Sequence, residues 1–192
     1  MKNSITLIFA IFSISLLMAF TEYKRQPKAR VVTTIPSVPI VKTKPEIKTK
    51  EIKFKGHTAF LNALGHQESG NRYDVVNRFG YMGKYQFGKS TLKTLKIKVT
   101  KEEFLNNPDL QEEAMKKLLL YNKKHLQKYI NRFDGQVING ILVTESGLLA
   151  AAHLGGAGSV KKWFRTGKIT ADGNGVKITQ YMQQFSGYSL YL

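Results

Sequence analysis

The sequence predicts a single, mainly α-helical domain with at most a small β hairpin, preceded by an apolar N-terminal segment and a basic linker. Three observations support this fold class. From residue 56 onward apolar residues recur at helical spacing, helix-start and helix-stop signals bound several of these stretches, and few segments alternate apolar with polar residues. The chain has no cysteine, so packing rather than disulfides must stabilise the domain.

Residues 1–20 are predicted to be a signal peptide or an N-terminal membrane anchor. An uncharged apolar run extends from Ile5 to Phe20 behind one basic residue, Lys2, which is typical of secretory leaders. The sequence Leu17-Met18-Ala19 matches a cleavage site poorly, so removal and retention both remain open. In either case we expect export to the periplasm or the cell envelope.

Residues 21–55 are predicted to be a disordered linker, because lysine, threonine, valine and proline dominate them without a helical apolar period. The whole chain carries a net charge of +17, which favours an anionic partner. The basic linker can therefore approach an anionic envelope polymer or a membrane surface, although a solvated spacer has the same composition. The remaining residues, 56–192, have the length of one domain.

The first predicted helix begins near Thr58, which can act as its N-cap. Phe60 and Leu64 lie on one face, and Glu68 follows beside this apolar stripe at the C-terminal end. Gly70 then favours termination of the helix. This helix is therefore expected to place a carboxyl group next to the core.

The middle of the domain is expected to alternate between loops and helices. Residues 79–88 combine aromatic residues with glycines and are predicted to form a loop or a small hairpin. Thr100 and Glu103 have the spacing of a capping box. Asn107 followed by Pro108 predicts the start of a long helix.

Three further helical stretches complete the predicted domain. Thr144 begins a helix that is expected to end at Gly155 and Gly156. Ser159 starts a short helix after these glycines, and residues 179–185 form a last turn or two. No segment of 20 to 50 residues repeats, so a solenoid is excluded.

Glu68 is the strongest catalytic candidate. A carboxyl group beside apolar and aromatic side chains suits a general acid, because desolvation disfavours the charged carboxylate. The aromatic residues between positions 73 and 87 offer flat apolar faces together with hydroxyl and amide groups, which suits sugar binding. On these grounds alone, an ordinary helix-end carboxylate is the simpler explanation of Glu68.

Three short motifs resemble those of lytic transglycosylases in the lysozyme-like superfamily. Residues 68–69 (Glu-Ser), 83–87 (Gly-Lys-Tyr-Gln-Phe) and 151–156 (Ala-Ala-His-Leu-Gly-Gly) correspond in order and spacing to Glu-Ser, Gly-Leu-Met-Gln and Ala-Tyr-Asn-Ala-Gly. The resemblance covers roughly residues 57–188. It implies a lysozyme-like fold and cleavage of the β-1,4 bond between N-acetylmuramic acid and N-acetylglucosamine in peptidoglycan, with a 1,6-anhydro product.

By this resemblance, Glu68 acts first as the acid and then as the base. From the aromatic segment and the resemblance together, the residues expected at the substrate are Ser69, Tyr81, Met82, Tyr85, Gln86, His153, Gly155 and Tyr181. The chain departs from the family pattern where Lys84-Tyr85 replaces Leu-Met, and where His153-Leu154 replaces Tyr-Asn and removes the amide expected at an N-acetyl group. The C-terminal tyrosine of the family corresponds to either Tyr181 or Tyr188.

Other acids and histidines are given non-catalytic interpretations. Glu145 follows Thr144 at a helix start, where an acidic residue complements the helix dipole. Asp74 and Glu145 are nevertheless the acids considered for a second carboxylate near Glu68. The four histidines show no metal-binding pattern, residues 172–175 match a plain turn better than a calcium loop, and no cofactor is expected.

Two alternative functions stay open. A hydrolytic lysozyme would use the same acid with a positioned water molecule, and a non-catalytic peptidoglycan-binding module would keep the groove without turnover. The basic charge also suits nucleic acid, but export argues against such a partner, so none is expected.

Overall fold

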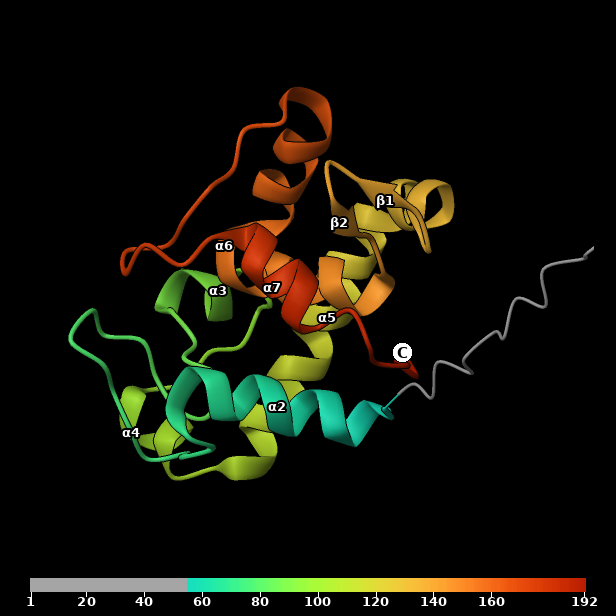
Figure 1. Cartoon of the computed structure of the whole chain (residues 1–192). Coiled ribbons are helices and arrows are strands. Elements are labelled where there is room, and N and C mark those ends of the chain that lie inside the picture. The colour runs from blue at the N-terminus through green and yellow to red at the C-terminus, as the bar shows by residue number, and fades with distance from the viewer. Residues whose placement is uncertain (1–54) are drawn as a thin grey trace, which may run out of the picture. The chain divides into compact units, whose positions relative to one another are not determined.

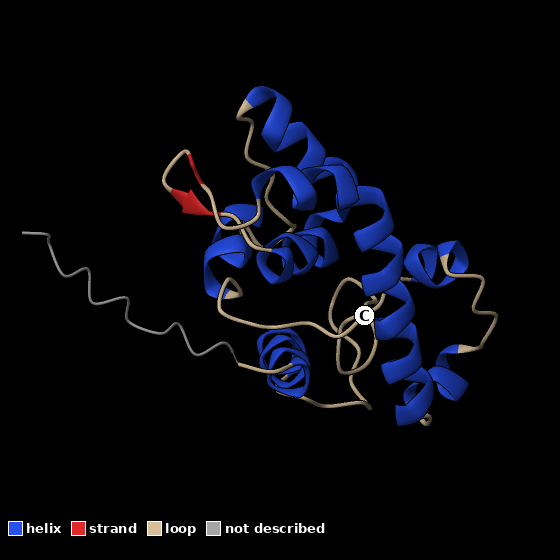
Figure 2. Ribbon diagram, turned by 90° about the vertical axis from the view of Figure 1, so that its right-hand side faces the viewer, coloured by secondary structure: helices blue, strands red, loops and turns tan. Residues whose placement is uncertain are grey.

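The computed structural model describes residues 55–192. The predicted leader and nearly all of the predicted linker lie outside these residues. The described part is mainly helical, as predicted, with one short hairpin (Figures 1 and 2). Its elements in chain order are α2 (His57–Ser69), α3 (Lys89–Thr94), α4 (Lys101–Leu105), α5 (Pro108–Phe133), β1 (Val137–Ile138), β2 (Ile141–Leu142), α6 (Glu145–Thr166) and α7 (Ile178–Gln184).

Helix α6 is the centre of the core. It packs against α5 and α7, which are visible around it in Figure 1. Residues 146–152 are all buried, so this half of the helix has no face left for solvent. A helix that is apolar on every side requires neighbours all round, which explains why α6 holds the other helices together.

The first helix shows one wrong and one confirmed prediction. Helix α2 begins at His57 behind Gly56, whose extended backbone fills the N-cap position, and Thr58 is an exposed residue inside the helix rather than its cap. The predicted stop at Gly70 is confirmed, because this residue has a φ of 69°. The Gly70 N–H donates to the His66 carbonyl, and the Asn71 N–H donates to the Gly65 carbonyl.

The two capping predictions in the middle of the chain are also confirmed. The Thr100 hydroxyl accepts a bond from the Glu103 N–H, and the Glu103 carboxylate accepts one from the Thr100 N–H, which starts α4. The Asn107 side chain accepts the Leu110 N–H ahead of Pro108, which starts α5.

The predicted helix end at Gly155 and Gly156 is confirmed as a break within α6. Gly156 has a non-helical φ of 77° and ψ of 154°, so α6 consists of two helices that meet at a kink, and the second of them ends at Thr166. Only a residue without a Cβ adopts this backbone readily. The last helix, α7, begins one residue before the predicted stretch.

Residues 79–88, predicted as a loop or a small hairpin, form a loop, and the hairpin of the structure lies elsewhere. Strands β1 and β2 pair antiparallel, with Val137 opposite Leu142 and Ile138 opposite Ile141. Residues 76–87 form a loop held by isolated bridges from Met82 to Val76 and to Phe87.

Among residues 55–192, none of the helices has both the length and the apolar character that a membrane span requires.

Candidate active site

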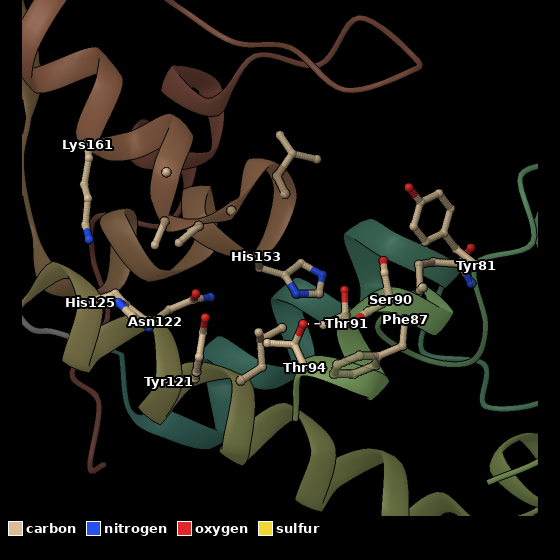
Figure 3. A pocket seen from close by; sticks show the side chains of 18 residues that line it. Tyr81, Phe87, Ser90, Thr91, Thr94, Tyr121, Asn122, His125, His153 and Lys161 are labelled. Carbon is tan, nitrogen blue, oxygen red and sulfur yellow. Dashed lines mark hydrogen bonds between the residues drawn. The ribbon is translucent and has the colours of Figure 1, made fainter. Parts of the chain in front are cut away.

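A cleft formed by two adjoining cavities contains Glu68. Each cavity has a volume of about 450 Å³, and the two share Tyr81, Gln86, His153 and Leu154 as lining residues. Glu68 and Tyr181 line the cavity beside the loop at residues 172–176. The other cavity, drawn in Figure 3, extends along α3, α5 and α6. The shared residues therefore mark the middle of one continuous groove.

Glu68 occupies the cleft with one carboxylate oxygen held and the other free. Its side chain is 14% exposed at the end of α2. The Tyr181 hydroxyl donates a hydrogen bond of 2.8 Å to Oε1. His153 Nε2 lies 3.5 Å from the same oxygen, which is longer than an ordinary N–H···O bond. No hydrogen bond to Oε2 occurs among the described residues, so this oxygen can face a substrate.

Tyr181 is fixed as a donor by its surroundings. Burial and the negative charge of Glu68 raise the pKa of the Tyr181 hydroxyl well above its usual range. The hydroxyl therefore keeps its proton at physiological pH and donates it toward Glu68. This contact favours Tyr181 over Tyr188 as the tyrosine beside the acid, because Tyr188 packs against Phe60 and Phe185 instead.

His153 provides a second polar group at the same place. Its side chain is only 7% exposed, and its ring lies edge-on to Phe87 with a centroid distance of 6.2 Å. Nδ1 is buried and has no hydrogen-bond partner among the described residues. Figure 3 shows the ring reaching toward the cavity from α6. A buried nitrogen without a partner costs free energy, so His153 Nδ1 is an unsatisfied polar atom at the edge of the cleft.

The loop at residues 83–87 is held in place by buried polar contacts. Gly83 has a φ of 72°, and a Cβ on this residue would overlap the carboxamide of Gln111. Gln111 Oε1 accepts the Lys84 N–H at 2.9 Å, and the Ser69 hydroxyl donates to the Lys84 carbonyl at 2.8 Å. Side chains of α2 and α5 thus bond to the loop from two sides, and Gln86 of the loop lines the middle of the cleft.

A buried ionic cluster lies beneath this loop. Glu112 of α5 accepts bonds from Lys84 at 2.8 Å, Tyr73 at 2.7 Å and Tyr85 at 2.8 Å. Burial opposes the charge on Glu112, but these three hydrogen bonds outweigh it and lower the pKa of the carboxyl group. Burial likewise opposes the charge on Lys84, but its bonds to Glu112 and Tyr73 raise the pKa of the ammonium group. Both groups therefore stay charged at neutral pH.

Of the substrate-contact residues expected from the sequence, the cleft contains Tyr81, Gln86, His153 and Tyr181. The other four do not line it. Ser69 bonds to backbone carbonyls, Tyr85 is fully buried against Glu112, Met82 is buried with 2% exposure, and a Cβ on Gly155 would contact Ile178. These residues support the cleft from behind, because successive side chains of a motif point to different sides of the backbone.

The second acid of the cleft is Asp172, which belongs to the turn that the sequence predicts at residues 172–175. It lines the cavity with Glu68, while its Oδ1 accepts the backbone N–H groups of Asn174 and Val176. Asp74 and Glu145 do not line either cavity. Glu145 forms an ion pair of 2.8 Å with Lys123, and Asp74 is exposed. Neither acid considered as a second carboxylate therefore lies at the cleft, and Glu145 occupies the first turn of α6, as interpreted from the sequence.

Two loops approach each other beside Glu68. Arg78 Nη2 donates a hydrogen bond of 2.9 Å to Asn174 Oδ1, and Gly173 lies close to the Phe79 ring. Phe79, Gly173 and Asn174 all line the cavity that contains Glu68. The loop at residues 171–177 is thus brought against the loop at residues 76–82, which is why Asp172 reaches the site.

No group of three histidine, cysteine or acidic residues suited to a metal ion occurs within residues 55–192.

A family model described as Transglycosylase SLT domain matches residues 46–174. This match covers more than half of the chain and all three short motifs of the sequence. Comparison with curated proteins and with solved structures gives no significant match.

Proposed function

Because this chain belongs to the transglycosylase SLT domain family, a family of peptidoglycan-cleaving lytic transglycosylases with a lysozyme-like domain, we propose that Glu68 is its single acid and base. The proposed reaction cleaves the bond between N-acetylmuramic acid and N-acetylglucosamine and leaves a 1,6-anhydro product. The observation that carries this proposal is the Glu68 carboxyl group, which lies in the cleft with Oε1 held by Tyr181 and Oε2 free.

The chemistry begins with proton transfer from Glu68 to the glycosidic oxygen. The bond from this oxygen to C1 breaks, and the N-acetyl oxygen of the same sugar stabilises the positive charge that develops at C1. The Glu68 carboxylate then takes the proton of the 6-hydroxyl, and O6 bonds to C1. Glu68 ends protonated as it began, and no water is consumed.

The contacts of Asp172, the second acid of the cleft, support a mechanism that uses Glu68 as its single carboxyl group. Glycosidases with two carboxyl groups use the second as a nucleophile or as the base for water. Asp172 is the only other acid that lines the cleft among residues 55–192, and two backbone N–H groups already occupy its Oδ1. These bonds fit a role in shaping the loop, which leaves the substrate's own N-acetyl group to assist the reaction.

We expect digestion of purified peptidoglycan by the full chain to release muropeptides that end in 1,6-anhydro-N-acetylmuramic acid. Mass spectrometry checks this directly, because a hydrolytic product is heavier by one water. Digestion in ¹⁸O-labelled water is the control, since a lytic transglycosylase incorporates no label at C1. Labelled reducing ends as the main product would show a lysozyme and contradict the proposed reaction.

Removal of the Tyr181 hydroxyl tests how Glu68 is positioned. We expect Tyr181→Phe to lower kcat/KM by about 10-fold, because a hydrogen bond to a charged group is worth about 1.5–3 kcal/mol and part of it is replaced by water. The melting temperature should change little, since the ring stays packed against Phe185. Tyr188→Phe is the matched control, and an equal loss in that variant would argue against a special role for Tyr181.

A further inference from the structure

A second groove lies outside the cleft and has no role in the proposed reaction. It has a volume of about 510 Å³ and consists of apolar residues with lysines around them. Met82 and Leu92 are buried and Ile97 and Val99 are half-buried, so they form the floor. The rim, which we call the lysine rim, consists of the exposed residues Lys89, Lys93, Lys96, Lys98 and Lys101.

The charge of this groove is largely uncompensated. No acidic residue lines it. Of the five lysines, only Lys101 forms an ion pair within residues 55–192, with the neighbouring Glu102 at 3.4 Å. An apolar floor surrounded by unpaired ammonium groups is complementary to a ligand that carries several carboxylates beside small apolar groups.

The position of the groove relates it to the cleft. Helix α3 separates the two, because Ser90, Thr91 and Thr94 line the cleft cavity while Leu92 and Lys93 line the groove. Figure 3 shows Ser90, Thr91 and Thr94 along the cleft. A helix with its side chains is roughly 10–12 Å across. The path over the outside of a cylinder this wide is roughly 16–19 Å, half its circumference. An extended peptide spans at most about 3.3–3.6 Å per residue, so about five residues pass from one side to the other.

The backbone at Lys96 is a separate observation about the lysine rim. This residue follows α3 with a φ of 58°, a conformation in which a Cβ is unfavourable and glycine is the usual choice. The Ile97 N–H closes the turn on the Leu92 carbonyl at 3.0 Å. A lysine at this position provides charge at the groove that the favoured glycine would not.

We propose that this second groove, with its lysine rim, binds the acidic peptide branch of a peptidoglycan strand whose glycan chain lies in the cleft. This inference rests on the proposed function. These branches carry free carboxylates and alanine methyl groups, which match the lysine rim and the apolar floor. The groove thereby directs the enzyme to strands that keep their peptides and fixes the register of the sugar that bears each branch.

The test compares two triple variants of the full chain on two substrates. The groove variant is Lys89→Gln, Lys93→Gln and Lys98→Gln, and the control variant is Lys116→Gln, Lys124→Gln and Lys128→Gln on exposed positions of α5. The substrates are glycan strands with intact peptides and strands from which an amidase has removed them. We expect the wild-type and control proteins to prefer peptide-bearing strands, and the groove variant to lose about 10-fold of that preference in kcat/KM.

A single substitution separates charge from folding. We expect Lys96→Gly to weaken binding of a soluble stem tetrapeptide about two- to fivefold, while its melting temperature stays equal or rises because glycine suits the backbone. Binding is measured by calorimetric titration of the tetrapeptide into the full chain at physiological salt. A weakened affinity caused by a damaged fold would instead be accompanied by a lower melting temperature.

Three results would overturn the inference. The first is an equal loss of the preference in the groove and control variants, and the second is a wild-type chain that does not bind the tetrapeptide. The third is a groove variant that loses binding to phosphatidylglycerol vesicles but keeps its affinity for the tetrapeptide. Failure of the proposed function has a different signature, since the wild-type protein would then cleave neither substrate. In that case the tetrapeptide titration alone decides the role of the groove.

Discussion

Substitution of Glu68 by glutamine is expected to reduce the turnover of peptidoglycan by about 10²–10⁴-fold, the usual contribution of a positioned general acid. Glutamine keeps the size of the side chain and can still accept the Tyr181 hydroxyl at its carbonyl oxygen. It has no proton of suitable acidity for the glycosidic oxygen and cannot act as a base. The loss should therefore appear in kcat, whereas binding of the strand is retained because the cleft keeps its shape.

The matched control for this variant is Asp172→Asn. Its amide oxygen can still accept the backbone N–H groups of Asn174 and Val176, so the loop should keep its conformation. We expect a reduction of less than about 10-fold, because the proposed mechanism gives Asp172 no proton to transfer. Unchanged turnover in Glu68→Gln would remove Glu68 from the mechanism, and equal losses in both variants would indicate a mechanism with two carboxyl groups.

The local signals of the chain predicted most of the helices because capping is a local interaction. The pairs Thr100 with Glu103 and Asn107 with Leu110 satisfy backbone groups within three residues of each other, so spacing alone reveals them. The missed hairpin had an equally local signal. Asn139 and Gly140 both have positive φ values, 51° and 78°, between the paired strands. An Asn-Gly dipeptide favours this turn, so these two residues carried the signal for the hairpin.

The cleft was harder to predict because it joins segments that are distant in the chain. Glu68 and Tyr181 are separated by 113 residues, and no spacing rule relates them. Asp172 lies at the site on a loop whose Asn174 bonds to Arg78, 96 residues away in the chain. Within residues 83–87 the motif predicted the right segment but not which side chains face substrate, since Gln86 points to the cleft and Tyr85 to Glu112.

Substitution of Glu112 by alanine is expected to lower the free energy of unfolding by about 3 kcal/mol. The change leaves the ammonium group of Lys84, whose side chain is 7% exposed, without its carboxylate partner. Removal of one member of a buried pair costs about 3–5 kcal/mol. We expect the lower end because the Glu112 side chain is 34% exposed and water can enter its place. For a domain of this size the melting temperature should fall by about 10 °C in calorimetry.

The double variant Glu112→Ala with Lys84→Met shows whether the unpaired charge causes this loss. A buried apolar side chain in place of the ammonium requires no partner, so most of the stability should return. If the two substitutions instead lower the melting temperature additively, the cluster stabilises the loop through packing rather than through charge.

The same cluster predicts how stability depends on pH. Because the pKa of Glu112 is lowered in the folded state, its contribution is present above the unfolded pKa of about 4.3 and is lost as pH falls through the folded value. The pKa of Lys84 is raised, so its contribution is complete below about 10.4 and is lost as pH rises through its folded value. The wild-type protein should therefore lose stability at both limits. The double variant should show a flatter curve in thermal unfolding from pH 3 to 11, and an unchanged curve would mean that other groups control the pH dependence.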